Sequence, residues 1–178
     1  MNGADLNIGI DGNVILPQPD DLSKREKEDA MGAYLMMFAA MGVGLPLPLL
    51  NLLASIIYYF VNKNKSRYVA FHSFQSMITQ IPISIINGSL VFWFIRIIFK
   101  DHPDFTLNFL VFLAFVILWN LFYIILSIRA CIYARRGQLY YMFPFGSFVF
   151  DIFYGSRAKD NLGKLEKDIP ANSPPIGF

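Results

Sequence analysis

The side chains best suited to acid–base or metal chemistry are few in this 178-residue chain. There are two histidines, His72 and His102, and a single cysteine, Cys131. Within the apolar runs, no acidic residue occurs before Asp151. A general acid–base pair or a metal cluster needs several converging Asp, Glu, His or Cys side chains. The sequence therefore predicts a protein that is not an enzyme and that uses no cofactor and no metal.

His72 belongs instead to a stripe of hydrogen-bonding side chains along the apolar run 68–99. At about 100° per residue in a helix, the members of this stripe share one face. They are His72, Gln75, Ser76, Thr79, Gln80 and Asn87. The opposite face is apolar, so the polar face should turn toward protein or water rather than lipid. Packing between helices is the favoured role of the stripe, and lining of a conducting path is the alternative.

Two other apolar runs carry shorter polar stripes. Asn51 and Ser55 share a side of one run, and Asn120 and Ser127 share a face of another. Hydrogen bonds between such side chains stabilise the packing of helices in lipid by about 0.6–2 kcal/mol per contact. Three helices with one stripe each would pack stripe to stripe.

The composition indicates an all-α integral membrane protein. Hydrophobic residues make up 55% of the chain and charged residues 16%, and the charges lie mainly in the tails and connecting loops. We expect three transmembrane helices within the runs 31–61, 68–99 and 105–134. A short aromatic segment, 140–155, is expected to lie at the membrane interface.

The first of these runs contains two glycines and two prolines within residues 42–48. Such a sequence breaks or strongly kinks a helix. The run is either one kinked span or a re-entrant pair of half-length helices. A single kinked span is the favoured reading.

Two polar tails flank the membrane domain, which we assign to residues 31–155. Residues 1–30 form an acidic N-terminal tail with a possible hairpin around Asp11-Gly12. Residues 156–178 form a polar C-terminal tail, expected to be disordered unless a partner holds it.

The basic residues predict the orientation in the membrane. They cluster in the first loop and at the end of the third run, as Lys63, Lys65, Arg67, Arg135 and Arg136. The first loop and the C-terminus should therefore be cytoplasmic, in a bacterial inner (plasma) membrane. The net charge of +2 is too small to favour nucleic acid as a partner.

Several short motifs resemble a known family. They are Asn62-Lys63, Phe71-His72 with Phe74-Gln75, Ala134-Arg135-Arg136-Gly137, and Tyr140-Tyr141-Met142-Phe143-Pro144. Together they resemble the chloroplast inner-envelope translocon subunit of about twenty kilodaltons and its small bacterial membrane-protein relatives. The resemblance implies a link to protein translocation or membrane-protein assembly.

The expected function is that of a non-catalytic accessory subunit of a larger membrane complex. The two tails are hard to stabilise against so small a bundle, so we expect other membrane protein subunits as partners, in a hetero-oligomer, besides the lipid bilayer. The alternative is an oligomeric channel or transporter subunit whose polar path is lined by the run 68–99.

Overall fold

The computed structural model describes residues 16–38, 48–99, 105–155 and 172, and this part of the chain contains helices and no strands. The elements are η2 (Pro19–Asp21), α1 (Lys24–Leu35), η3 (Met36–Phe38), α3 (Pro48–Asn62), α4 (Arg67–Ile98), α5 (Leu107–Arg135) and α6 (Gly146–Tyr154). The all-α class is therefore confirmed over these residues. The hairpin expected around Asp11-Gly12 lies outside them.

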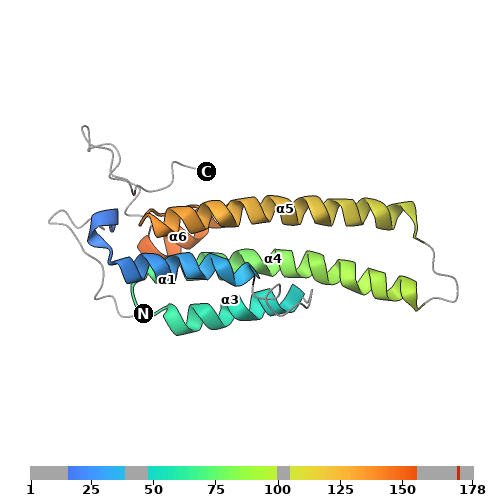
Figure 1. The fold of residues 1–178 in the computed structure, drawn as a ribbon, viewed down its shortest axis with the longest axis horizontal. Helices are drawn as coiled ribbons and strands as arrows, with labels where there is room; N and C mark the ends of the chain where they lie inside the picture. Colours follow the sequence, from blue (N-terminus) through green and yellow to red (C-terminus); the bar gives the residue numbers. More distant parts are fainter. Residues whose placement is uncertain (1–15, 39–47, 100–104, 156–171, 173–178) are drawn as a thin grey trace.

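Helices α4 and α5 form a long antiparallel pair that runs the length of the molecule (Figure 1). With 32 and 29 residues, they extend about 48 and 44 Å. Both are long and apolar enough to cross a membrane. Apolar side chains such as Ile85, Phe92, Val111 and Leu118 are exposed along them. This surface suits lipid, and the structure thus shows two helices of spanning length rather than the three expected.

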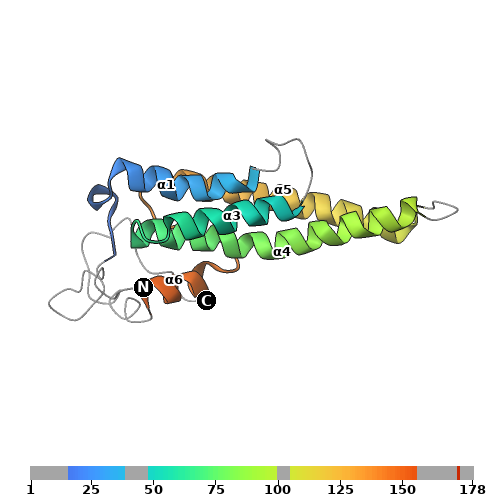
Figure 2. The ribbon, with the colours of Figure 1, turned by 90° about the horizontal axis from the view of Figure 1, so that it is seen from below.

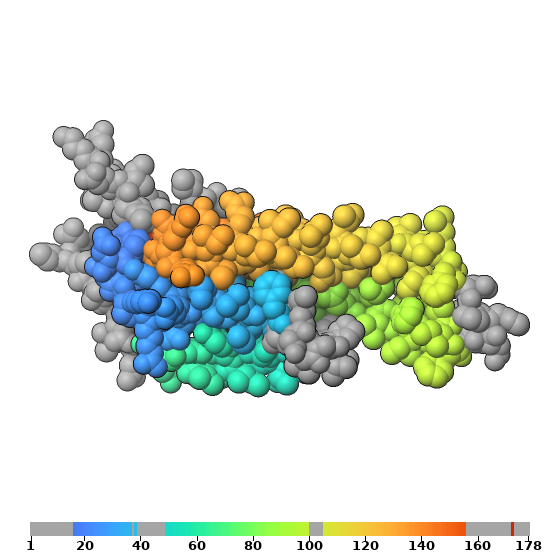
Figure 3. Space-filling view, in the orientation of Figure 1, coloured from blue at the N-terminus to red at the C-terminus, as the bar shows by residue number. Residues whose placement is uncertain are grey.

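The run 31–61 is divided between two shorter helices. Helix α1 has 12 residues and α3 has 15, so neither reaches the 18 or more residues of a typical span. Helix α3 lies beside α4, and α1 lies beside both α4 and α5, so the two short helices cover the same half of the long pair and leave its other half uncovered (Figures 2 and 3). The structure has two half-length helices here, as in the re-entrant alternative, in place of one kinked helix. Residues 42–47 of the Gly/Pro break lie outside the described part.

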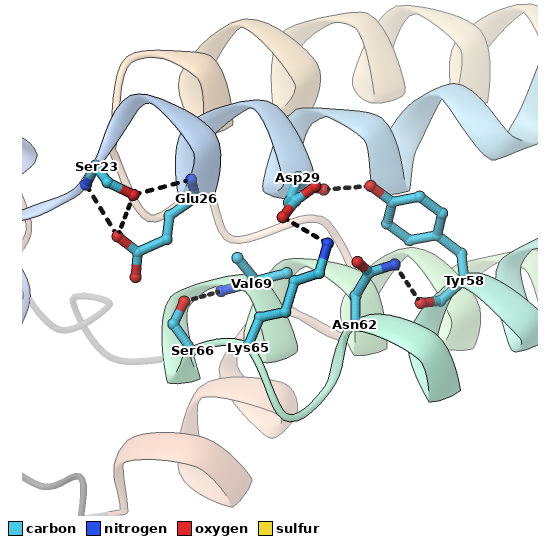
Figure 4. A network of polar contacts seen from close by, with 8 residues as sticks. All are labelled: Ser23, Glu26, Asp29, Tyr58, Asn62, Lys65, Ser66 and Val69. Carbon is cyan, nitrogen blue, oxygen red and sulfur yellow. Dashed lines mark hydrogen bonds and ion pairs between the residues drawn. The ribbon is translucent and has the colours of Figure 1, made fainter.

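Contacts between the beginning of α1 and the end of α3 show that these helices are antiparallel (Figure 4). The Tyr58 hydroxyl donates to the Asp29 carbonyl oxygen at 2.8 Å. Lys65, just beyond α3, pairs with the Asp29 carboxylate at 2.7 Å. The chain therefore returns at the end of α3 to the level at which α1 began.

Helix α1 begins where Ser23 caps it. The Ser23 hydroxyl accepts from the Glu26 backbone N–H, and the Glu26 carboxylate accepts from the Ser23 backbone N–H at 2.9 Å. This reciprocal capping box satisfies two amide groups that a helix end leaves free. Partial burial raises the pKa of Glu26, but the hydrogen bonds from Ser23 outweigh it and hold that pKa below its usual value.

The aromatic segment expected at the interface contains α6, which lies beside the beginning of α4 (Figure 2). The Phe71 ring contacts the rings of Phe153 and Tyr154 at centroid distances of 6.4 and 5.8 Å. The Arg67 guanidinium donates to the Phe153 carbonyl oxygen. The packed core thus lies at the end of the bundle where α1, α3 and α6 surround α4.

Candidate functional site

The polar stripe of α4 meets a tyrosine from α1. The Tyr34 hydroxyl lies 2.9 Å from His72 Nδ1, and Gln75 Nε2 donates to the same hydroxyl at 2.8 Å. Because Gln75 is the donor in its bond, the Tyr34 hydroxyl hydrogen is free to go to His72 Nδ1. All three side chains are buried. Tyr34, His72 and Gln75 thus form a buried polar cluster between two helices.

Gln75 also connects this cluster to the segment after α5. Its Nε2 donates to the Tyr140 carbonyl oxygen at 2.8 Å. Next on the stripe, the Ser76 hydroxyl donates to the Ala33 carbonyl oxygen of α1 at 2.7 Å. One face of α4 therefore holds both α1 and the chain that leaves α5.

Small residues allow α1 to come close enough for these bonds. Ala30 and Ala33 of α1, and Ala130 and Ala134 of α5, are at most 1% exposed. Alanine at a helix contact lets two backbones approach, as is common between membrane helices. Tyr68 adds a bond from α4 to the end of α5, because its hydroxyl donates to the Ala134 carbonyl oxygen at 2.8 Å.

Farther along α4, the stripe faces α5 directly. The Thr79 and Tyr123 hydroxyls are 3.2 Å apart. Asn87 and Asn120 exchange amide hydrogen bonds of 3.0 and 2.7 Å. This reciprocal pair joins the two amides directly between α4 and α5. We call the whole arrangement, from Tyr34 and His72 to Asn87 and Asn120, the polar seam.

The remaining residues of the predicted stripes take varied positions. Gln80 of α4, Ser55 of α3 and Ser127 of α5 are buried, and Asn51 of α3 is half-buried. The seam is thus centred on α4, with α1 and α5 as the partners seen in its hydrogen bonds. The predicted stripe-to-stripe contact through α3 stays a prediction.

The basic residues named from the sequence gather at the end where α1 begins and α5 finishes (Figure 1). Lys65 pairs with Asp29, Arg67 binds the backbone of α6, and Lys63 lies 4.7 Å from the centre of the Phe60 ring. Arg135 and Arg136 are exposed at the end of α5. These cations are therefore partly engaged within the protein rather than forming one open patch.

Sequence reasoning missed three contributors to this end of the molecule. Tyr34 and Tyr140 were counted only as members of apolar or aromatic segments. Asn172 lies in a tail expected to be disordered unless a partner holds it, and this residue is 2% exposed. Its side chain binds the backbone at Pro17, Gly137 and Leu139. An amide in a polar tail gives no periodic signal, so only the tertiary structure reveals this contact.

Metal ligands do not converge within the described residues. Over 16–38, 48–99, 105–155 and 172, no group of three His, Cys, Asp or Glu side chains is placed to hold a metal ion. That finding does not test the prediction that the chain is not an enzyme, which stays a prediction.

Comparison with protein families identifies a different relationship from the one that the motifs suggested. The model of the magnetosome magnetite crystal formation protein family matches residues 26–150, from the first turn of α1 into α6. No curated protein and no solved structure matches the chain. The resemblance to the chloroplast translocon subunit is therefore wrong, and with it the expected link to protein translocation. Its motifs lie at packing positions, such as buried Phe71 and His72, which a small helical membrane protein needs whatever its function.

Proposed function

The chain belongs to the magnetosome magnetite crystal formation protein family, and on that premise we propose that it is a non-catalytic membrane protein of the magnetosome that takes part in forming the magnetite crystal. The observation that carries this proposal is the family match, which extends over nearly the whole helical bundle. Two long apolar helices support its place in the magnetosome membrane. We include other membrane subunits as partners in the proposal, since apolar surface is exposed on both long helices.

The polar seam supports a structural role over a chemical one. Its hydrogen bonds, such as Gln75 with Tyr34 and Asn87 with Asn120, join parts of this one chain. Ser76 likewise binds the backbone of α1. The role of the polar seam is to hold α1 against α4 and α5. The bundle as a whole then acts at the membrane where the crystal forms.

This proposal is tested by deleting the gene in a magnetite-forming bacterium and restoring it on a plasmid. We expect crystals of altered number, size or shape in the deletion strain, measured by electron microscopy of whole cells. The wild-type gene should restore normal crystals, and an empty plasmid should not. Unchanged crystals in the deletion strain, with the neighbouring genes expressed normally, would contradict the proposed function.

We also propose an arrangement in the membrane. Helices α4 and α5 cross it, whereas the chain enters it through α1 from the basic end and returns to that end through α3. On α5, the uncharged stretch from Leu107 to Ile128 extends about 33 Å, close to the hydrocarbon thickness of about 30 Å. Leu49, near the start of α3, lies in a groove with Ser84 and Gly88, near the middle of α4. In this arrangement α3 reaches about half the depth of the layer.

Thiol labelling of single-cysteine variants distinguishes this topology from three crossings. In a Cys131→Ser background, we expect Lys24→Cys and Lys63→Cys to react with an impermeant maleimide from the same side, because both residues lie at the basic end. Phe99→Cys, at the other end of α4, should react only from the opposite side. Three crossings would instead place Lys24 and Lys63 on opposite sides. The measurement is labelling of intact and of opened vesicles, with the basic side cytoplasmic.

A further inference from the structure

A groove runs along the second half of α4 and begins beside the start of α3. It encloses about 810 Å³ and extends from Leu49, near the start of α3, to Arg96, in the last turn of α4. Gly88 lies between these ends, and among the described residues a Cβ built on it would meet no atom within 4 Å beyond its own helix backbone and chain neighbours. The described part of the chain therefore leaves space beside the helix at this point.

The lining of the groove is mainly apolar, with Ser84 and Ser89 among its residues, and it is cationic at one end. Ile85 and Phe92 are 63% and 64% exposed, and Trp93 lies beside them. The Arg96 guanidinium lies 6.0 Å from the centre of the Phe92 ring, so this cation is held next to the groove wall. A ligand that fits this lining has a long apolar part and an anionic head.

The dimensions of the groove match one leaflet of a bilayer. From Ser84 to Arg96 the helix extends about 18 Å, and half of the hydrocarbon layer is about 15 Å. Arg96 is close to the connection after α4, at the level where arginine and tryptophan meet lipid headgroups. An acyl chain in the groove would therefore extend from the middle of the membrane to a headgroup at Arg96.

We propose that this groove binds a membrane phospholipid with an anionic headgroup, whose acyl chain lies over Gly88 and whose phosphate pairs with Arg96. Charge complementarity favours this occupant over a second copy of the chain. A symmetric dimer through the same groove would bring two Arg96 cations to the same end of one interface, without an anion between them. The proposal needs only the membrane location and does not depend on the role in magnetite formation.

The test measures lipid retention by the full-length protein in neutral detergent, using native mass spectrometry. Phosphatidylglycerol and phosphatidylcholine with identical acyl chains are the two probes. We expect one phosphatidylglycerol to bind more tightly than phosphatidylcholine. Arg96→Gln should reduce that preference about fivefold, the effect of one basic side chain near an anionic lipid. Arg96→Lys should keep most of it.

Two further variants make the result specific to the groove. Gly88→Leu should weaken binding of both lipids, because the new side chain occupies space beside Gly88, where a Cβ meets none of the described residues outside its own helix backbone and chain neighbours. Arg135→Gln removes an exposed arginine at the other end of the molecule and should leave the preference unchanged. Equal retention of the two lipids by the wild type, or an unchanged preference in Arg96→Gln, would overturn the proposal. A dimer that forms without lipid and is lost in Gly88→Leu would assign the groove to a second copy instead.

Discussion

Replacing Gln75 with leucine is expected to lower the apparent Tm of the purified protein by about 5–15 °C, corresponding to about 2–4 kcal/mol. Leucine is close to glutamine in size, but it removes the donor that binds both Tyr34 and Tyr140. The Tyr140 carbonyl oxygen then loses that partner, and the Tyr34 hydroxyl keeps only His72. Each buried polar group left unsatisfied costs about 1–3 kcal/mol. The measurement is the temperature at which half of the full-length protein, in mild detergent, is no longer monodisperse.

The matched control for this experiment is Ser89→Ala. Ser89 is also a polar residue of α4, but it is not buried, and its hydroxyl binds the Ile85 carbonyl oxygen of the same helix. Its removal should leave the Tm almost unchanged. A double-mutant cycle with Tyr34→Phe should give a coupling of about 0.5–3 kcal/mol if the two side chains act as one contact. Equal stability of Gln75→Leu and wild type would show that the polar seam does not hold the bundle together.

The position of the polar seam on α4 could be predicted because helix periodicity alone decides which residues share a face. Their partners did not have to be known in order to place four residues on one face: His72, Gln75, Ser76 and Thr79. Their partners could not be predicted in the same way. Tyr34 follows a charged stretch and counted as an apolar residue, so nothing in the sequence marked its hydroxyl as the group that Gln75 binds.

The Gly/Pro break was predictable as a break, but its geometry was not. Glycine and proline remove helical hydrogen bonds whether the chain continues with a kink or turns back. The contacts that show a reversal join Asp29 with Tyr58 and Lys65. These residues are far apart in the sequence, and their pairing depends on how α1 and α3 pack on α4. Local sequence rules therefore left both possibilities open.

The mistaken family resemblance has a physical explanation in the residues that carried it. Phe71 packs its ring against α6, and Gly137 has a φ of +80° just after α5. A side chain at Gly137 would come within 2.9 Å of the Pro19 backbone. Aromatic packing and a left-handed glycine at a helix end are requirements of a fold rather than of a reaction. Such motifs indicate a small helical bundle, and they say little about what the bundle does.

One contact in the C-terminal tail has a large expected effect because it joins two separate segments. Asn172 Nδ2 donates to the carbonyl oxygens of Pro17 and Gly137 at 2.6 and 2.8 Å. Its Oδ1 accepts from the Leu139 backbone N–H at 2.6 Å. Gln18 adds two bonds to the Asn172 backbone. The side chain of Asn172 thus joins the segment before α1 to the chain after α5.

Asn172→Asp should release this contact at neutral pH, because a carboxylate cannot donate and would face two carbonyl oxygens. We expect a loss of about 3 kcal/mol, or about a hundredfold faster exchange of the Leu139 amide hydrogen, measured by hydrogen–deuterium exchange mass spectrometry. Burial among carbonyl oxygens raises the pKa of the new carboxyl group in the docked state, so protection should return partly as the pH falls toward about 4 and be lost as it rises. Asn64→Asp makes the same chemical change at an exposed residue just after α3 and should leave Leu139 protected. If both variants exchange like the wild type, Asn172 does not join these two segments.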